Sequence, residues 1–205
     1  MANKLVFQNF LHLSQMQEAE VFYPKSASEW RTWLEQHHIP KSSVWVVFYS
    51  KASQKPSLSW SEAVDIALCY GWIDSKKIKI DHETSHQFFS KRKAKSTWSK
   101  INKDKISKLI ESGLMAKAGL DSIEVAMQNG SWTILDQVEE LIVPQDFEDA
   151  LNAKAGAKEF YESLSKSVRK MMLAWLVFAK RPETRQNRID EIVELASKRQ
   201  KPKQF

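Results

Sequence analysis

Cysteine is nearly absent from this chain of 205 residues, since Cys69 is the only one. A single cysteine excludes an internal disulfide, which argues against a small secreted domain and favours a reducing compartment. Residues 1–13 carry one lysine and no long apolar run, so we expect no signal peptide there. These observations predict a cytoplasmic protein.

Long hydrophobic runs and glycine-rich segments are missing as well. The longest apolar stretch, residues 171–179, is far too short to span a bilayer, so we expect no membrane insertion. The five glycines are scattered singly and form no loop of the kind that cradles phosphate groups. We therefore expect no cofactor.

The composition that remains is typical of a globular protein. Hydrophobic residues make up 42% of the sequence, which is enough for a packed core, and charged residues make up 27%. The formal net charge of +6 is a moderate excess, which permits an acidic partner such as phosphate or nucleic acid without requiring one. The length allows one large domain or two small ones.

Capping signals and hydrophobic periodicity divide the chain into a mixed first part and a helical last third. The S-x-x-E patterns at residues 26–29 and 59–62 predict two helix starts. The β-branched and aromatic run at 44–49 predicts a buried strand, and the looser alternation over 76–81 and 86–92 predicts a hairpin.

Helical spacing returns from Ser96 and continues to the basic C-terminal tail, with a connector at 131–143. We predict an α+β fold, with a small antiparallel-containing sheet and packed helices followed by a helical C-terminal module. The connector places the first domain at residues 1–130 and the second at 131–205.

The segment from residue 68 to residue 119 concentrates aromatic rings among charged and polar side chains. Tryptophan is costly to place, because its ring needs a pocket and its N–H needs a partner. This density predicts a surface that holds a ligand, although no motif identifies a reaction and no catalytic residue is assigned. The candidate ligand-binding residues are Trp72, Asp74, Arg92, Ser96, Trp98 and Asn102.

Each of these candidates also has a purely structural interpretation. Asp74 could be a turn aspartate or a carboxylate partner for Arg92. An arginine, a hydroxyl and an amide beside an indole could hold a carboxylate or phosphate, but Ser96 could equally cap a helix with Trp98 in the core. Cys69 lies on an apolar helical face and is most simply a small core residue.

Two further patterns in the same region suggest other partners. Residues 91–108 contain eight basic residues and one acid, a run that could follow a nucleic-acid backbone but is more often a solvated helix face. Residues 81–86 contain Asp81, His82, Glu83 and His86, but a hairpin would point these side chains in different directions. We therefore predict no metal site.

Four separate strings resemble one known family, the YdeI/OmpD-associated or bacteriocin-protection proteins. They are LCYGWIDS (68–75), FSKRKAKSTWSKIN (89–102), GLMAKAGL (113–120) and AKRPETRQNRI (179–189). Lys91, Ala94 and Lys117 stand where the family usually has proline. The resemblance implies an α+β first domain, a helical second module and a cytoplasmic bacterial protein linked to stress response or bacteriocin tolerance. It supplies no reaction.

The last of these strings contains Glu183, Arg185 and Arg188. Glu183 falls in the first turn of a helix, where the helix dipole favours an acid. These residues could form a surface charge network, or an arginine could dock onto the first domain, for example through Asp74. We favour docking, as an interdomain or anion contact.

The leading hypothesis from the sequence is a non-enzymatic binding or adaptor protein. A small anionic ligand or a protein partner would lie in a groove between the sheet and the C-terminal helices, with Trp72 and Trp98 as its floor and Arg92 as the anion contact. One alternative is a hydrolase or transferase with Asp74 as general base. Another is a nucleic-acid-binding protein that uses the basic run.

Overall fold

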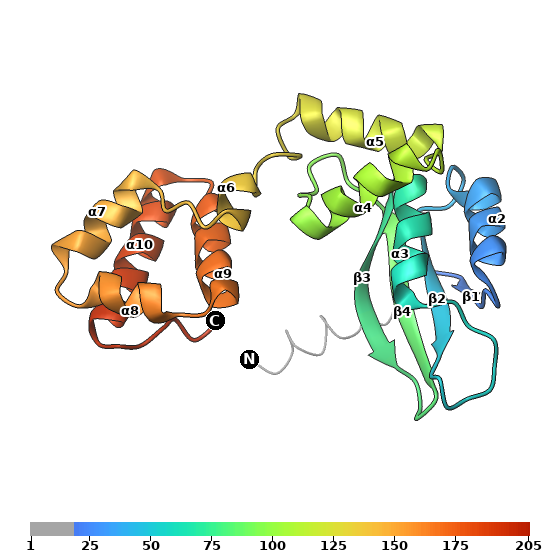
Figure 1. Cartoon of the computed structure of the whole chain (residues 1–205), viewed down its shortest axis with the longest axis horizontal. Coiled ribbons are helices and arrows are strands. Elements are labelled where there is room, and N and C mark those ends of the chain that lie inside the picture. The colour runs from blue at the N-terminus through green and yellow to red at the C-terminus, as the bar shows by residue number, and fades with distance from the viewer. Residues whose placement is uncertain (1–18) are drawn as a thin grey trace, which may run out of the picture. The chain divides into compact units, whose positions relative to one another are not determined.

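The computed structural model describes residues 19–205, and the expectation for residues 1–13 lies outside them. It confirms the predicted α+β fold, with a small mixed sheet followed by a helical part (Figure 1). The chain divides into two compact units. The first contains the residues up to Ser96 and 104–128, and the second contains 97–103 and 129–205.

The first unit is built on a sheet with the strand order β1-β2-β4-β3. Its strands are β1 (Val21–Phe22), β2 (Ser43–Tyr49), β3 (Trp72–Lys79) and β4 (Thr84–Lys91). β1 runs parallel to β2, and the other pairs are antiparallel. The predicted hairpin is therefore present, but β3 begins at Trp72, four residues before the alternating pattern.

Two helices, α2 (Ala27–His37) and α3 (Trp60–Cys69), belong to the same unit. The ring of Trp30 in α2 packs against Phe89 of β4, with centroids 5.4 Å apart, and its Nε1 donates to the carbonyl of Ala63 at 3.0 Å. Both helix starts agree with their capping signals. The Ser59–Glu62 box is reciprocal, whereas at α2 the Ser26 hydroxyl accepts from the Glu29 N–H but the Glu29 carboxylate accepts from the N–H of Lys25.

A bulge in β3 changes which side chains share a face of the sheet. Asp74 pairs with Phe89, and Lys77 pairs with Gln87, with a register shift between Asp74 and Lys77. Residues three apart on a regular strand point to opposite faces. Here the β4 partners of Asp74 and Lys77 are only two residues apart, so these partners share one face. The bulge therefore brings Asp74 and Lys77 to the face that carries Phe89.

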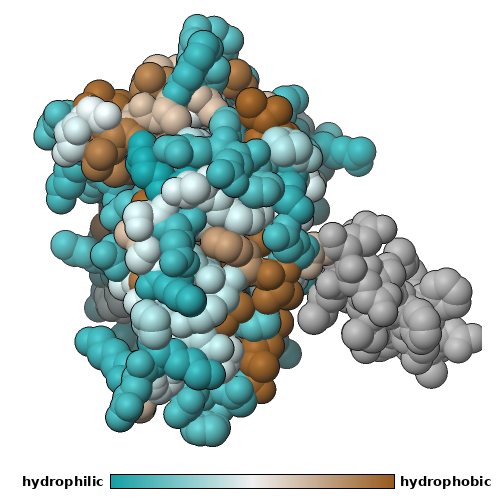
Figure 2. Space-filling view, turned by 90° about the vertical axis from the view of Figure 1, so that its right-hand side faces the viewer, coloured by the Kyte–Doolittle hydropathy of each residue, from teal (hydrophilic) through white to brown (hydrophobic). Residues whose placement is uncertain are grey.

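Two further helices complete the first unit, α4 (Lys100–Glu111), which begins in the second unit, and α5 (Lys117–Gln128). Figure 2 shows hydrophobic residues gathered at the top of this side of the molecule, where Figure 1 places α5. Leu120, Val125 and Met127 of that helix are exposed. α5 is held close to the end of α3, because the Ala116 N–H donates to the carbonyl of Cys69 at 3.1 Å.

The second unit is entirely helical in the described residues. Its helices are α6 (Asp136–Glu139), α7 (Gln145–Ala153), α8 (Ala157–Ser163), α9 (Lys166–Val177) and α10 (Pro182–Ser197). A core of buried side chains joins them, including Phe147, Tyr161, Leu173 and Ile192. Within residues 19–205, none of the helices combines the length and hydrophobicity that crossing a bilayer requires.

We predict that Gly119→Ala destabilises the first unit by about 2–3 kcal/mol, the usual cost of overpacking. A Cβ at Gly119 would lie 2.3 Å from the carbonyl oxygen of Cys69, so backbone would have to move. Gly113→Ala is the matched control, because it has open space around it but a positive φ of 66°. It should cost roughly 1 kcal/mol. Urea unfolding followed by circular dichroism measures both, and equal losses would contradict the close packing of α5.

Candidate functional site

The first unit contains a cleft of about 910 Å³ at the end of the sheet where the β3–β4 hairpin turns. Its walls come from the end of β2 and the loop at 50–58, from the start of α3, and from the β3–β4 hairpin. The loop is anchored at two points: the Tyr23 hydroxyl donates to the carbonyl of Pro56, and the Tyr49 N–H donates to Ser57 Oγ at 3.1 Å. A volume of this size suits a small molecule.

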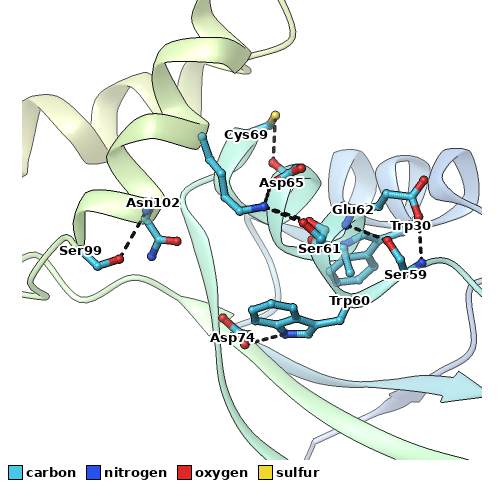
Figure 3. A network of polar contacts seen from close by, with 12 residues as sticks. Trp30, Ser59, Trp60, Ser61, Glu62, Asp65, Cys69, Asp74, Ser99 and Asn102 are labelled. Carbon is cyan, nitrogen blue, oxygen red and sulfur yellow. Dashed lines mark hydrogen bonds and ion pairs between the residues drawn. The ribbon is translucent and has the colours of Figure 1, made fainter. Parts of the chain in front are cut away.

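Trp60, the first residue of α3, forms part of the cleft wall and is 53% exposed. Figure 3 shows its indole directed at the carboxylate of Asp74, where Nε1 donates to Oδ2 at 2.9 Å. The same oxygen accepts a second hydrogen bond of 2.9 Å from Nε2 of Gln87, a side chain that is only 5% exposed. The orientation of the exposed ring is therefore fixed from the interior of the unit.

Two of the three acids that line the cleft accept hydrogen bonds from nearby backbone N–H groups. Hydrogen bonds with Ser59 in the capping box lower the pKa of Glu62. The carboxylate of Asp81 accepts from the N–H groups of Glu83 and Thr84, and these bonds lower the pKa of Asp81. Glu83 lies 3.9 Å from the imidazole of His82.

The lysines of the cleft, in contrast, have few partners. Lys55 lies over the ring of Tyr49, 4.5 Å from its centroid. Lys51, Lys77 and Lys79 are exposed, and none of them forms an ion pair with a residue in the described part of the chain. The cleft thus presents lysines without an ion pair in the described residues beside a fixed aromatic ring.

The prediction that Trp72 and Trp98 form the exposed floor of one groove is wrong. Trp72 is 0% exposed and packs edge-to-face on Trp33 in the first unit, with ring centroids 5.8 Å apart. Trp98 is 2% exposed and packs on Trp132 in the second unit, with centroids 5.1 Å apart. Each indole fills a core, which leaves neither ring face open to a ligand.

The polar candidate residues also belong to different units. Arg92 is in the first unit, where burial lowers its pKa to about 10 and the charge of Asp74 opposes that shift. The N–H of Ser96 closes a turn on the carbonyl of Lys93, and the helix that follows begins only at Lys100. Asn102 is in the second unit, where its N–H donates to Ser99 Oγ at 3.4 Å.

Arg185 and Arg188 have partners inside the second unit, and their docking onto the first domain stays a prediction. Arg185 forms a bidentate pair with Asp146 at 2.6 and 2.8 Å and also donates to the carbonyl of Leu176 at 3.1 Å. Arg188 stacks over the ring of Trp175 at 4.9 Å. Glu183 lies in the first turn of α10, as predicted.

Three lysines of the basic run at 91–108 form ion pairs within the units. Lys105 pairs with Asp65 and donates to Ser61 Oγ at 2.9 Å, so it joins α4 to α3. Lys103 pairs with Asp136, and Lys100 lies 3.5 Å from Glu140. Lys91 donates to the carbonyl of Ile39 at 2.6 Å. Three of the eight positive charges in the run are thereby paired with an acid of the same unit.

Cys69 is buried, as the sequence predicts, and its thiol donates to the carbonyl of Asp65 at 3.3 Å. Burial raises the pKa of this thiol, which opposes a nucleophilic role. Within residues 19–205, no three side chains among histidine, cysteine, aspartate and glutamate gather as metal ligands would.

Sequence reasoning missed Trp60 and the lysines of the cleft. The signal was present, since a tryptophan directly after an N-cap serine starts a helix and is less buried there than within the helix. Lys77 and Lys79 alternate with Ile78 along the hairpin. That alternation predicts a polar face, but the partner segments of that face lie far away in the sequence.

Comparison with known proteins divides the chain in a similar way. Residues 140–199 match the family model described as "Bacteriocin-protection, YdeI or OmpD-Associated". Residues 22–122 match a different model, "Domain of unknown function (DUF8412)". The family resemblance is therefore shown for part of the chain only. No curated protein and no solved structure gives a significant match.

We predict that Arg185→Ala raises the pKa of Asp146 towards its ordinary value, because the hydrogen bond from Arg185 is the main cause of its lowered pKa. A lowered carboxyl pKa adds stability above the unfolded pKa of about 3.9, and this stability is lost as the pH falls through the folded pKa. The variant should therefore lose less stability on acidification below about pH 4 than the parent chain. Carbon-detected NMR titration of Asp146 measures the shift.

Arg181→Ala is the control for that experiment, since it removes the same charge from an exposed position four residues earlier. It should leave the titration of Asp146 unchanged. An Asp146 pKa that stays low in Arg185→Ala would show that the pair does not form.

Proposed function

We propose that this chain is a cytoplasmic, non-enzymatic binding protein of the bacteriocin-protection type, whose first unit holds a small anionic ligand in the cleft beside Trp60. The charge arrangement of the cleft carries this proposal. Its two capping and turn acids, Glu62 and Asp81, are bonded to backbone N–H groups, whereas Lys51, Lys77 and Lys79 have no ionic partner among the described residues. An anion in the cleft would accept charge-assisted hydrogen bonds from these lysines.

A small ligand is favoured over a protein partner for this cleft. The cleft is concave, and its volume of about 910 Å³ lies within the range of small-molecule sites. β3, the edge strand beside it, carries three lysines and a bulge, features that oppose pairing with a strand of another chain.

The two other functions receive less support from the geometry. Asp74 Oδ2 already accepts hydrogen bonds from Trp60 and Gln87, so this oxygen is not open to a substrate proton as a general base requires. A nucleic-acid backbone needs a continuous cationic track, whereas Lys100, Lys103 and Lys105 form ion pairs within the protein.

We predict that Lys77→Ala weakens the binding of anionic metabolites about tenfold, the effect of losing one charge-assisted contact of about 1.4 kcal/mol. The measurement is a thermal-shift screen of the full chain against anionic metabolites, followed by calorimetric titration of the hits. Lys77→Ala with Lys79→Ala should remove binding at the concentrations screened.

Lys76→Ala is the matched control, because Lys76 is the neighbouring residue but lies over the rings of Trp45 and Phe88 on the opposite face of the sheet. It removes the same charge and should leave affinity within twofold. Equal weakening by both variants, or a screen in which no anion stabilises the chain, would contradict the proposal.

A further inference from the structure

Trp60 differs from the other tryptophans of the first unit in how it is placed. Trp30, Trp33, Trp45 and Trp72 are at most 5% exposed, whereas 53% of Trp60 is exposed. An exposed tryptophan that only filled space would be free to turn, but the bond from Nε1 to Asp74 holds this ring in one orientation. The carboxylate of Asp74 thus holds an exposed aromatic ring in place.

That face is open within the cleft. Among residues 19–205, no aromatic ring stacks on Trp60, and no cation is placed over it. The other large rings of the cleft are less open, because Phe48 is only 9% exposed and Tyr49 has Lys55 over its face and an edge contact with Tyr23 at 5.0 Å. Trp60 is therefore the ring of the cleft that a flat ligand group can stack on.

The cleft lysines continue from this ring along the hairpin. Gln87, which bonds to the same carboxylate oxygen as Trp60, pairs across the strands with Lys77. Lys79 pairs with Ser85, two residues further, a step of roughly 7 Å along a strand. An aromatic surface is thus followed by two cations on the same face of the sheet.

We infer that the ligand of this cleft is a mononucleotide, with its base stacked on Trp60 and its phosphate bound by Lys77 and Lys79. This inference rests on the proposed function and adds the class of the ligand. One open ring accommodates one base, whereas a single-stranded nucleic acid would need a series of such rings along a continuous cationic groove. A stacking contact without hydrogen bonds to base edges predicts weak selectivity among the four bases.

Calorimetric titration of the full chain tests this with the four nucleoside 5′-monophosphates, the matching nucleosides, inorganic phosphate and a ten-nucleotide single-stranded DNA. At least one monophosphate should bind tenfold or more tightly than its nucleoside and than phosphate. Acrylamide quenching of tryptophan fluorescence is the second readout. Because the other tryptophans of the first unit are buried, the ligand should protect mainly Trp60.

Two variants separate the base contact from the phosphate contact. Trp60→Leu should weaken monophosphate binding roughly tenfold or more, as loss of one stacked base does, and should leave phosphate binding unchanged. Lys77→Ala with Lys79→Ala should reduce the monophosphate to the affinity of the nucleoside. Ile110→Ala, which removes an exposed apolar side chain of the first unit, should change neither.

The outcomes distinguish this inference from the proposed function. If other anions bind in a lysine-dependent way but Trp60→Leu has no effect, the mononucleotide assignment is overturned and anion binding remains. If the oligonucleotide binds more tightly than every monophosphate, with affinity that falls steeply with salt, the assignment is overturned in favour of a nucleic-acid site. If no monophosphate binds, the mononucleotide assignment is likewise overturned. Circular dichroism of each variant establishes that its fold is intact.

Discussion

The carboxylate of Asp74 joins three elements of the first unit at one atom. Asp74 belongs to β3, and its Oδ2 accepts hydrogen bonds from Trp60 at the start of α3 and from Gln87 within β4. The amide of Gln87 is buried, and a buried donor without an acceptor costs about 1–3 kcal/mol. This acceptor therefore contributes to the position of α3 relative to the hairpin, and with it to the shape of the cleft.

Local sequence signals predicted the starts of α2 and α3. The Ser59–Glu62 box starts α3, and Gly71 follows its end with a positive φ of 70°, as a C′ glycine does. The bulge in β3 could not be predicted in this way, because its register is set by pairing with β4. The regular alternation of side chains along a strand would place Asp74 and Lys77 on opposite faces. A site containing both residues could therefore not be recognised from the sequence.

The second unit explains why a family motif need not mark a binding site. Arg185 links α10 to the start of α7 through Asp146 and to the end of α9 through the carbonyl of Leu176. Arg188 covers the ring of Trp175 and donates to its carbonyl at 2.5 Å. Both arginines of the AKRPETRQNRI string thus contribute to the packing of three helices in the region that matches the bacteriocin-protection family.

The charge of the cleft shows why composition alone is a poor guide to a ligand. Four lysines and three acids line it, which counts as near balance. The positions of the acids add what the count omits, because Glu62 and Asp81 are bonded to backbone N–H groups and neither forms an ion pair with a lysine in the described residues. Aromatic density misled in the same way, since burial depends on packing between distant segments. Trp72 and Trp98 are packed in two cores, whereas Trp60, which precedes the aromatic-rich segment, is the ring that a ligand can reach.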